Sequence, residues 1–242
     1  MQSGAEGAVR VGRTVSTTGA LVERLSRSWF VIVIVISGLL VGLPWLAPVF
    51  MRLGWTEAGR AIYFAYSFLC HQLPQRSFFL FGERFNYSLA EIQAAWQATN
   101  DPWLLRQFIG TPDMGYKVAW SDRMVALYTS IPLAALIWWP LRRRLRALPL
   151  WGLALLALPI LADGASHMVS DLAGMGAGFR DGNQWLATLT GNRFPAALYA
   201  GDAWGSFNSL MRLVTGVLFG AGVVWAAFPR FYADLGGAPR QA

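Results

Sequence analysis

Long runs of apolar residues without any charge dominate the pattern along the chain. Four such runs cover residues 28–51, 124–141, 147–162 and 213–229. A helix needs roughly 17–25 apolar residues to cross the hydrocarbon core of a bilayer. The first run meets this length outright, and the second and fourth meet it if polar residues at one end lie among the lipid headgroups. The third run is short and contains Pro159, so it predicts either a further span or a re-entrant or tilted segment.

Arginines flank these runs unevenly, and the bias predicts the orientation of the spans. Four arginines precede the first run and four separate the second run from the third (Arg10, Arg13, Arg24, Arg27; Arg142, Arg143, Arg144, Arg146). Basic residues concentrate on the cytoplasmic side of membrane helices. We therefore predict a multi-pass protein of the cell membrane with four spans and both termini in the cytoplasm. Residues 52–117 and 163–206 are then expected on the outer side.

The ends of the chain are expected to lie outside the membrane domain. Residues 1–27 predict a basic N-terminal arm and residues 230–242 a C-terminal tail, around a single transmembrane helical domain at residues 28–229. No apolar stretch with a small-residue cleavage site precedes Ser28, so we do not expect a signal peptide.

Two segments of the outer region predict helices that do not cross. Residues 61–73 are apolar and aromatic but too short to span, and Pro74 follows them. They predict a short half-helix whose end carries polar groups, or a plain interfacial helix. Residues 88–108 predict an amphipathic surface helix interrupted at Asp101-Pro102. The predicted fold class is an all-α polytopic integral membrane protein, with four transmembrane helices plus this half-helix and surface helix on the outer side.

Composition supports this class and excludes others. Apolar residues make up 55% of the 242-residue chain and charged residues 14%, against about a quarter charged in soluble domains. This balance argues against a soluble enzyme, a disordered chain or a disulfide scaffold. The net charge of +7 comes from arginines that flank apolar runs. The expected partner is therefore the lipid bilayer, and we expect no nucleic acid.

The few polar residues near the span ends are the candidate functional residues, since ionisable groups at membrane depth are costly. The predicted topology places all of them on the outer side. The predicted ligand-binding residues are Cys70, His71, Gln72, Arg76, Ser121, Asp122, Arg123, Asp163, His167, Asn208 and Arg212. Asp171 and Asp202 belong to the same groups.

The chemistry of these residues allows two interpretations. His71, Asp163 and His167 are candidate ligands for a divalent metal ion, and Asp163 and His167 share a helix face at i, i+4. The alternative is structural: the arginines and aspartates form interhelical ion pairs, and the histidines form buried hydrogen bonds. A single cysteine and the lack of a CxxC motif give no further metal signal.

The segment CHQLPQRSFFLFG, with two later segments, resembles a known family. The chain is similar to predicted bacterial and archaeal membrane proteins grouped as domain of unknown function family 2085. The matched positions are Cys70, His71, Gln72, Pro74, Arg76, Ser77, Gly82, Arg123, Tyr128, Asp163, Gly164, Asn208, Arg212, Thr215 and Gly216. Ser121 and Met124 stand where the family has cysteines, and Ala126 where it has a glycine. The resemblance implies the membrane architecture and this choice of residues, and it implies no activity.

Three hypotheses for function fit the sequence. The first is an outward-facing polar pocket that binds a small ligand or metal ion, with Arg76, Arg123 and Arg212 as charge partners. The second is an accessory subunit that docks its aromatic outer helices onto other subunits of a larger membrane complex. The third is a metal-dependent membrane enzyme, a hydrolase that uses a metal-activated water. No nucleophile elbow or phosphate loop indicates catalysis.

Overall fold

The protein is a helical membrane protein with a small sheet. The computed structural model describes the backbone of residues 17–235 and the side chains from Ser28 to Leu235. Most of the predicted N-terminal arm and C-terminal tail lies outside the described residues. The described part contains four helices long and apolar enough to cross a membrane, which confirms the predicted fold class. They are α1 (Thr17–Arg52), α5 (Asp122–Leu141), α6 (Leu150–Asp171) and α10 (Phe207–Asp234).

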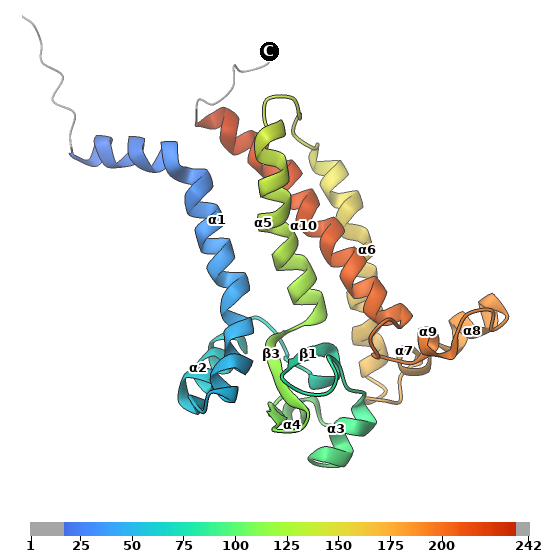
Figure 1. The fold of residues 1–242 in the computed structure, drawn as a ribbon. Coiled ribbons are helices and arrows are strands. Elements are labelled where there is room, and N and C mark those ends of the chain that lie inside the picture. Colours follow the sequence, from blue (N-terminus) through green and yellow to red (C-terminus); the bar gives the residue numbers. More distant parts are fainter. Residues whose placement is uncertain (1–16, 236–242) are drawn as a thin grey trace, which may run out of the picture.

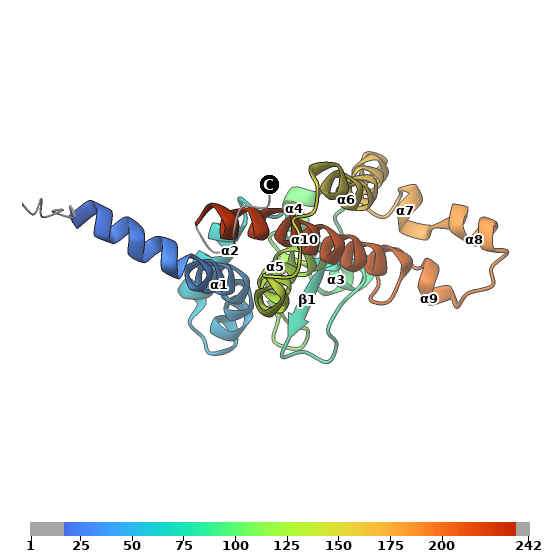
Figure 2. The same cartoon turned by 90° about the horizontal axis from the view of Figure 1, so that it is seen from above.

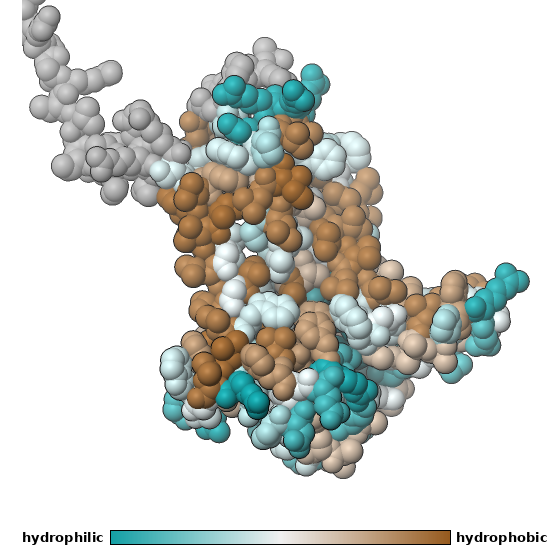
Figure 3. Space-filling view, in the orientation of Figure 1, coloured by the Kyte–Doolittle hydropathy of each residue, from teal (hydrophilic) through white to brown (hydrophobic). Residues whose placement is uncertain are grey.

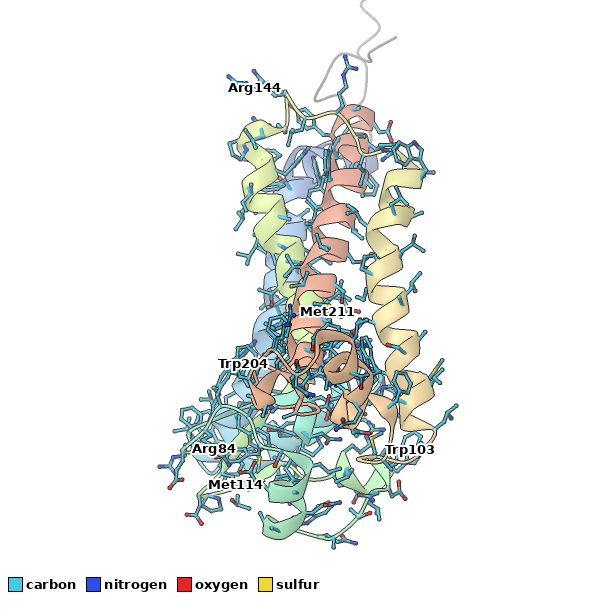
Figure 4. All side chains as sticks on the ribbon, turned by 90° about the vertical axis from the view of Figure 1, so that its right-hand side faces the viewer. Arg84, Trp103, Met114, Arg144, Trp204 and Met211 are labelled. Atoms are coloured by element: carbon cyan, nitrogen blue, oxygen red, sulfur yellow. The ribbon has the colours of Figure 1, made fainter. Side chains whose placement is uncertain are left out.

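The four long helices form an open bundle. Helix α10 packs between α5 and α6, while α1 packs against α5 and against the elements that follow it (Figures 1 and 2). The apolar surface forms a belt over these helices, and hydrophilic residues gather at both ends (Figure 3). The short connection that carries Arg144 lies at one end, together with the start of α1 and the end of α10 (Figures 1 and 4). Both ends of the described chain, Thr17 and Leu235, therefore lie on the side of the arginine cluster, as an even number of crossings requires.

The third apolar run forms a full-length helix and not a re-entrant segment. Helix α6 has 22 residues and continues from the charge-free part through Asp163 to Asp171. A helix of this length rises by about 33 Å, enough to cross a hydrocarbon core. Likewise α10 extends to Asp234, beyond the predicted end at residue 229. The polar residues at the helix ends, which the hydropathy pattern leaves out, supply the missing length.

All shorter elements lie at the end of the bundle opposite Arg144, and we call them the cap (Figure 4). The cap comes from residues 53–121 and 172–206. Its elements are α2 (Thr56–Tyr66), η1 (Pro74–Arg76), β1 (Ser77–Leu80), α3 (Leu89–Ala95), α4 (Pro102–Leu105), β2 (Gly110–Thr111), β3 (Gly115–Ser121), α7 (Phe179–Gly182), α8 (Gln184–Thr190) and α9 (Ala196–Tyr199).

A three-stranded antiparallel sheet, which the sequence pattern does not predict, organises one half of the cap. Its strand order is β1-β3-β2, and Ser77 pairs with Ser121 where β3 leads directly into α5. Buried Phe79 from β1 packs with Ile92 of α3 and with Leu105 of α4 in one apolar cluster. The sheet therefore fixes the cap to the first turn of α5.

The structure corrects two predicted elements of the cap. The half-helix expected at 61–73 is α2, which begins earlier and ends at Tyr66, before Pro74. The surface helix expected at 88–108 is two short helices, α3 and α4. Asp101 caps α4 and Pro102 occupies its first position. The predicted interruption at Asp101-Pro102 is therefore confirmed, because these two residues start a new helix.

Small residues bring α10 close to α5. A side chain at Gly216 would meet Ala126, and a side chain at Gly220 would meet Ser130 and the Leu127 carbonyl. Membrane helices use small residues at such spacings to let their backbones approach. This contact holds the polar ends of α5 and α10 side by side.

Candidate functional site

The polar ends of three long helices meet the cap in a network of buried ion pairs. At its centre Arg212 of α10 is 2% exposed. Its Nε lies 2.9 and 2.8 Å from the two carboxylate oxygens of Asp122, and its Nη1 lies 2.6 Å from Asp202 Oδ1. Asp122 is the first residue of α5, where the helix dipole also favours a negative charge. The pair therefore links the first turn of α5 to the second turn of α10.

Arg76 ties the cap to α6 and to the loop before α10. Its Nη1 and Nη2 donate to the two oxygens of Asp171, both at 2.8 Å, and its Nε donates to Asp202 Oδ2 at 2.9 Å. Fork-shaped pairs of this kind are among the stronger charge-assisted hydrogen bonds. Burial alone raises the pKa of Asp202, but Arg76 and Arg212 outweigh it and hold that pKa well below its ordinary value. Asp202 is therefore a fixed anion between two arginines.

Asp163 of α6 lies between two other arginines. Arg123 Nη2 is 2.5 Å from Asp163 Oδ2, and Arg180 Nη2 is 2.6 Å from Oδ1. The same Arg180 nitrogen lies 3.1 Å from His167 Nε2. Helix α6 continues far enough to place Asp163, His167 and Asp171 on one face, as their spacing predicts. The network as a whole contains four arginines and four aspartates and is electrically balanced.

The Cys70–Gln72 segment is a strained turn held by hydrogen bonds. Gln72 has φ of 53°, a left-handed conformation that is uncommon for residues other than glycine. Its backbone N–H donates to Cys70 Sγ at 3.4 Å, its amide Nε2 donates to the Tyr63 carbonyl at 2.8 Å, and its carbonyl accepts from Lys117 Nζ at 2.7 Å. The Cys70 thiol and Ser121 are also hydrogen-bonded, at 3.4 Å. The turn is therefore bound to α2 and β3, and strain retained in this way is typical of functional sites.

Lys117, the single lysine of the chain, is fully buried beneath this turn. Its Nζ donates to the carbonyls of Gln72 and Arg106, at 2.7 and 2.6 Å. Tyr63 in turn donates its hydroxyl to the Lys117 carbonyl. Burial lowers the pKa of Lys117 to about 7; the Cys70 thiol opposes this shift and Arg106 adds to it. The sequence gives no signal for this role, since a lone lysine in a polar stretch is ordinarily exposed.

A pocket of about 100 Å³ opens at the centre of these contacts. Leu73, Met124 and eight of the eleven predicted ligand-binding residues line it. The eight predicted residues are Cys70, His71, Gln72, Arg76, Ser121, Asp122, Arg123 and Arg212. His71 is exposed, so the pocket reaches the surface of the protein at this residue. The motif Cys-His-Gln, the start of α5 and the start of α10 therefore surround one space, although they are far apart in the sequence.

Two residues that line the pocket carry buried hydrogen-bond donors that the protein leaves unused. Among the described residues, Arg212 Nη2 and Arg123 Nε have no hydrogen-bond partner. Three arginines and one aspartate line the space. An unpaired buried donor is costly, so the arrangement favours an acceptor, water or anion, inside the pocket.

The remaining three predicted residues lie outside this pocket. His167 is buried against Arg180 and Asp163, and Asn208 donates its amide to the Arg180 carbonyl at 2.6 Å. The predicted metal site is not formed: in the described part of the chain, no group of three or more His, Cys, Asp or Glu side chains is placed to hold a metal ion. His167 contacts the Arg180 guanidinium, which competes with a cation for the imidazole, while His71 lines the pocket and His167 does not.

Sequence reasoning missed Arg180. It lies in a Gly- and Asn-rich stretch where an arginine is expected to be solvated, yet it is 6% exposed. Helix α7 folds back onto α6 because the Arg180 backbone N–H donates to Ser170 Oγ at 3.0 Å. A side chain at Gly178 would collide with Ser170, so the glycine before α7 permits this approach. A glycine alone does not reveal such a contact in the sequence.

One comparison with known proteins gives a relative. The chain is 26% identical over 171 residues to the uncharacterized protein MJ1492 of Methanocaldococcus jannaschii, and the match covers 67% of this chain and 83% of that protein. No protein-family model and no solved structure matches the chain.

Proposed function

We propose that this integral membrane protein binds a small anion in the pocket beside Cys70 and Arg212. The observation that carries the proposal is the pair of unpartnered guanidinium nitrogens, Arg212 Nη2 and Arg123 Nε, of two residues that line a pocket where arginines outnumber aspartates. Arginine is the side chain best suited to carboxylate and phosphate groups. The bound ligand completes the hydrogen bonds that the protein leaves open.

The size of the pocket limits the ligand. A cavity of about 150 Å³ holds a benzene molecule, so a pocket of about 100 Å³ accommodates a group with only a few heavy atoms. An inorganic phosphate, or a small carboxylate such as acetate, fits this limit. The ligand enters beside the exposed His71 side chain. We further propose that this opening faces the outer side, because the arginine cluster at the opposite end favours the cytoplasm.

Binding of inorganic phosphate to the purified protein in detergent tests the proposal. We expect a saturable rise of the melting temperature with phosphate concentration, with acetate as a second probe and chloride as the control for ionic strength. His71→Ala removes an exposed lining residue without disturbing the ion pairs and should weaken binding. Arg60→Ala, at an exposed ion pair of α2, is the matched control and should leave binding unchanged. A folded wild type that binds neither phosphate nor acetate would overturn the proposal.

A second function, docking onto a larger membrane complex, is supported by one observation. Phe64, Phe68 and Trp103 of the cap are 68%, 75% and 66% exposed and form an apolar surface on α2, the turn after it and α4. Purification in a mild detergent tests this function. A partner protein should co-purify with the wild type at fixed stoichiometry, and it should be absent from the purified Phe68→Ser variant.

We also propose that the chain belongs to domain of unknown function family 2085. This is supported by the position of the matched residues: Cys70, Arg76, Arg123 and Arg212, from three matched segments, line one pocket. In this chain Ser121 stands in place of a family cysteine and is hydrogen-bonded to Cys70. An alignment with family members tests the assignment. We expect Cys70, Arg76, Arg123 and Arg212 to occur together in those relatives.

A further inference from the structure

A second and larger hollow lies between α6 and α10, on the other side of Asp163 from the anion pocket. Its volume is about 500 Å³, within the range of about 300–1,000 Å³ that is usual for small-molecule sites. Pro159 of α6 lines the part farthest from the cap, while Met211 and Phe207 of α10 and Trp185 of α8 line the part near the cap. The wall is mainly apolar, and no residue is shared with the anion pocket. We call this hollow the lateral groove.

The polar residues of the lateral groove are Asp163, Ser166, Arg180 and Thr215, and the charged pair lies where α7 meets α6. Arg180 is more than nine-tenths buried. Its Nη2 contacts Asp163 and His167, but among the described residues its Nε has no acceptor. Arg123 binds the same carboxylate, so two guanidinium groups share one aspartate and the local charge is positive. This end of the groove therefore suits an anion that accepts a hydrogen bond from Arg180.

The position of the groove along the bundle suits a lipid. It spans the ends of α6 and α10 nearest the cap, and Met211 lies just where the long helices meet the cap (Figure 4). Around it, Leu158 and Leu161 of α6 and Val214 of α10 are exposed. These side chains belong to the apolar surface that faces the hydrocarbon core in a membrane. A ligand therefore reaches the groove sideways from the bilayer, with its charged end toward the cap.

We propose that the lateral groove binds one anionic phospholipid from the leaflet on the cap side. An acyl chain lies between Pro159 and Met211, and the headgroup phosphate accepts a hydrogen bond from Arg180. The anion pocket and the lateral groove are linked through a single carboxylate, because Asp163 binds Arg123 on one side and Arg180 on the other. The lipid site is nevertheless independent of the anion pocket, since its lining residues are different.

Native mass spectrometry of the detergent-solubilised protein tests the lipid site with two probes that share the same acyl chains, phosphatidylglycerol and phosphatidylcholine. We expect one retained phosphatidylglycerol per chain, bound at least about tenfold more tightly than phosphatidylcholine, because the choline cation of phosphatidylcholine offsets its phosphate charge beside Arg123 and Arg180. Met211→Trp fills the groove and should abolish the adduct. Leu133→Trp places the same side chain on an exposed face of α5 and should retain it. Arg180→Gln should remove the preference for phosphatidylglycerol and keep acyl-chain binding.

Several outcomes would overturn the lipid site. Equal retention of both lipids by the wild type, or equal adducts in Met211→Trp and Leu133→Trp, would show that the groove selects no anionic lipid. Displacement of the adduct by millimolar inorganic phosphate would assign Arg180 to a free anion instead. Phosphate binding by Met211→Trp should match the wild type, so failure of the lipid site and failure of the anion pocket are distinguishable.

Discussion

Replacing Arg212 by alanine should destabilise the protein more than replacing any exposed arginine. Arg212 and Asp122 are 2% and 4% exposed. Without the guanidinium, Asp122 keeps only the backbone N–H of Arg123, at 2.7 Å, among its hydrogen bonds in the described part of the chain. Asp202 still has Arg76. An uncompensated buried charge typically costs 3–5 kcal/mol, so we expect a loss of about 3–5 kcal/mol in the free energy of unfolding.

Three matched variants separate this effect from a general loss of packing. Arg123→Ala should cost less, about 1.5–3 kcal/mol, because Asp163 keeps Arg180. Arg60→Ala removes an exposed pair with Glu57 and should cost at most about 1 kcal/mol. The double variant Arg212→Met/Asp122→Leu should recover most of the loss, since an apolar pair of similar size avoids the buried charge.

Reversible unfolding in mixed detergent micelles, followed by circular dichroism, measures these differences. The expected order of destabilisation is Arg212→Ala, then Arg123→Ala, then Arg60→Ala. The reasoning is wrong if Arg212→Ala and Arg60→Ala unfold at the same point, because Asp122 would then be solvated. It is also wrong if the double variant is no more stable than Arg212→Ala alone.

Two further predictions concern the cap and the helix packing. Because the pKa of Lys117 is about 7 in the folded protein and ordinary in the unfolded chain, only the unfolded state binds this proton between pH 7 and about 10. Stability should therefore rise with pH from 7 to 9 by up to about 1.4 kcal/mol per unit, and melting curves of Lys117→Met should lack this rise. Gly220→Ala should cost about 1–3 kcal/mol, because its Cβ would lie 2.6 Å from the Leu127 carbonyl oxygen, whereas Gly38→Ala meets nothing within 4 Å and should cost none.

The membrane architecture could be predicted from the sequence because it depends on local properties. An apolar run in lipid must satisfy its own backbone hydrogen bonds, so it forms a helix whatever its neighbours are. Alternate crossings then place the ends of successive helices on defined sides. For this reason Asp122, Asp163 and Arg212 could be assigned to one end of the bundle, although their partners could not be identified.

The tertiary structure alone decided how those polar groups pair. Strand β1 pairs with β3, about 40 residues later, and no local periodicity marks such short strands. Asp163 binds Arg180 because α7 folds back onto α6, and the histidines are separated because His71 belongs to the turn beside Lys117. The division between local and non-local information has a physical reason: hydrophobic transfer acts on each segment by itself, whereas ion pairs depend on distances between side chains that only chain folding brings together.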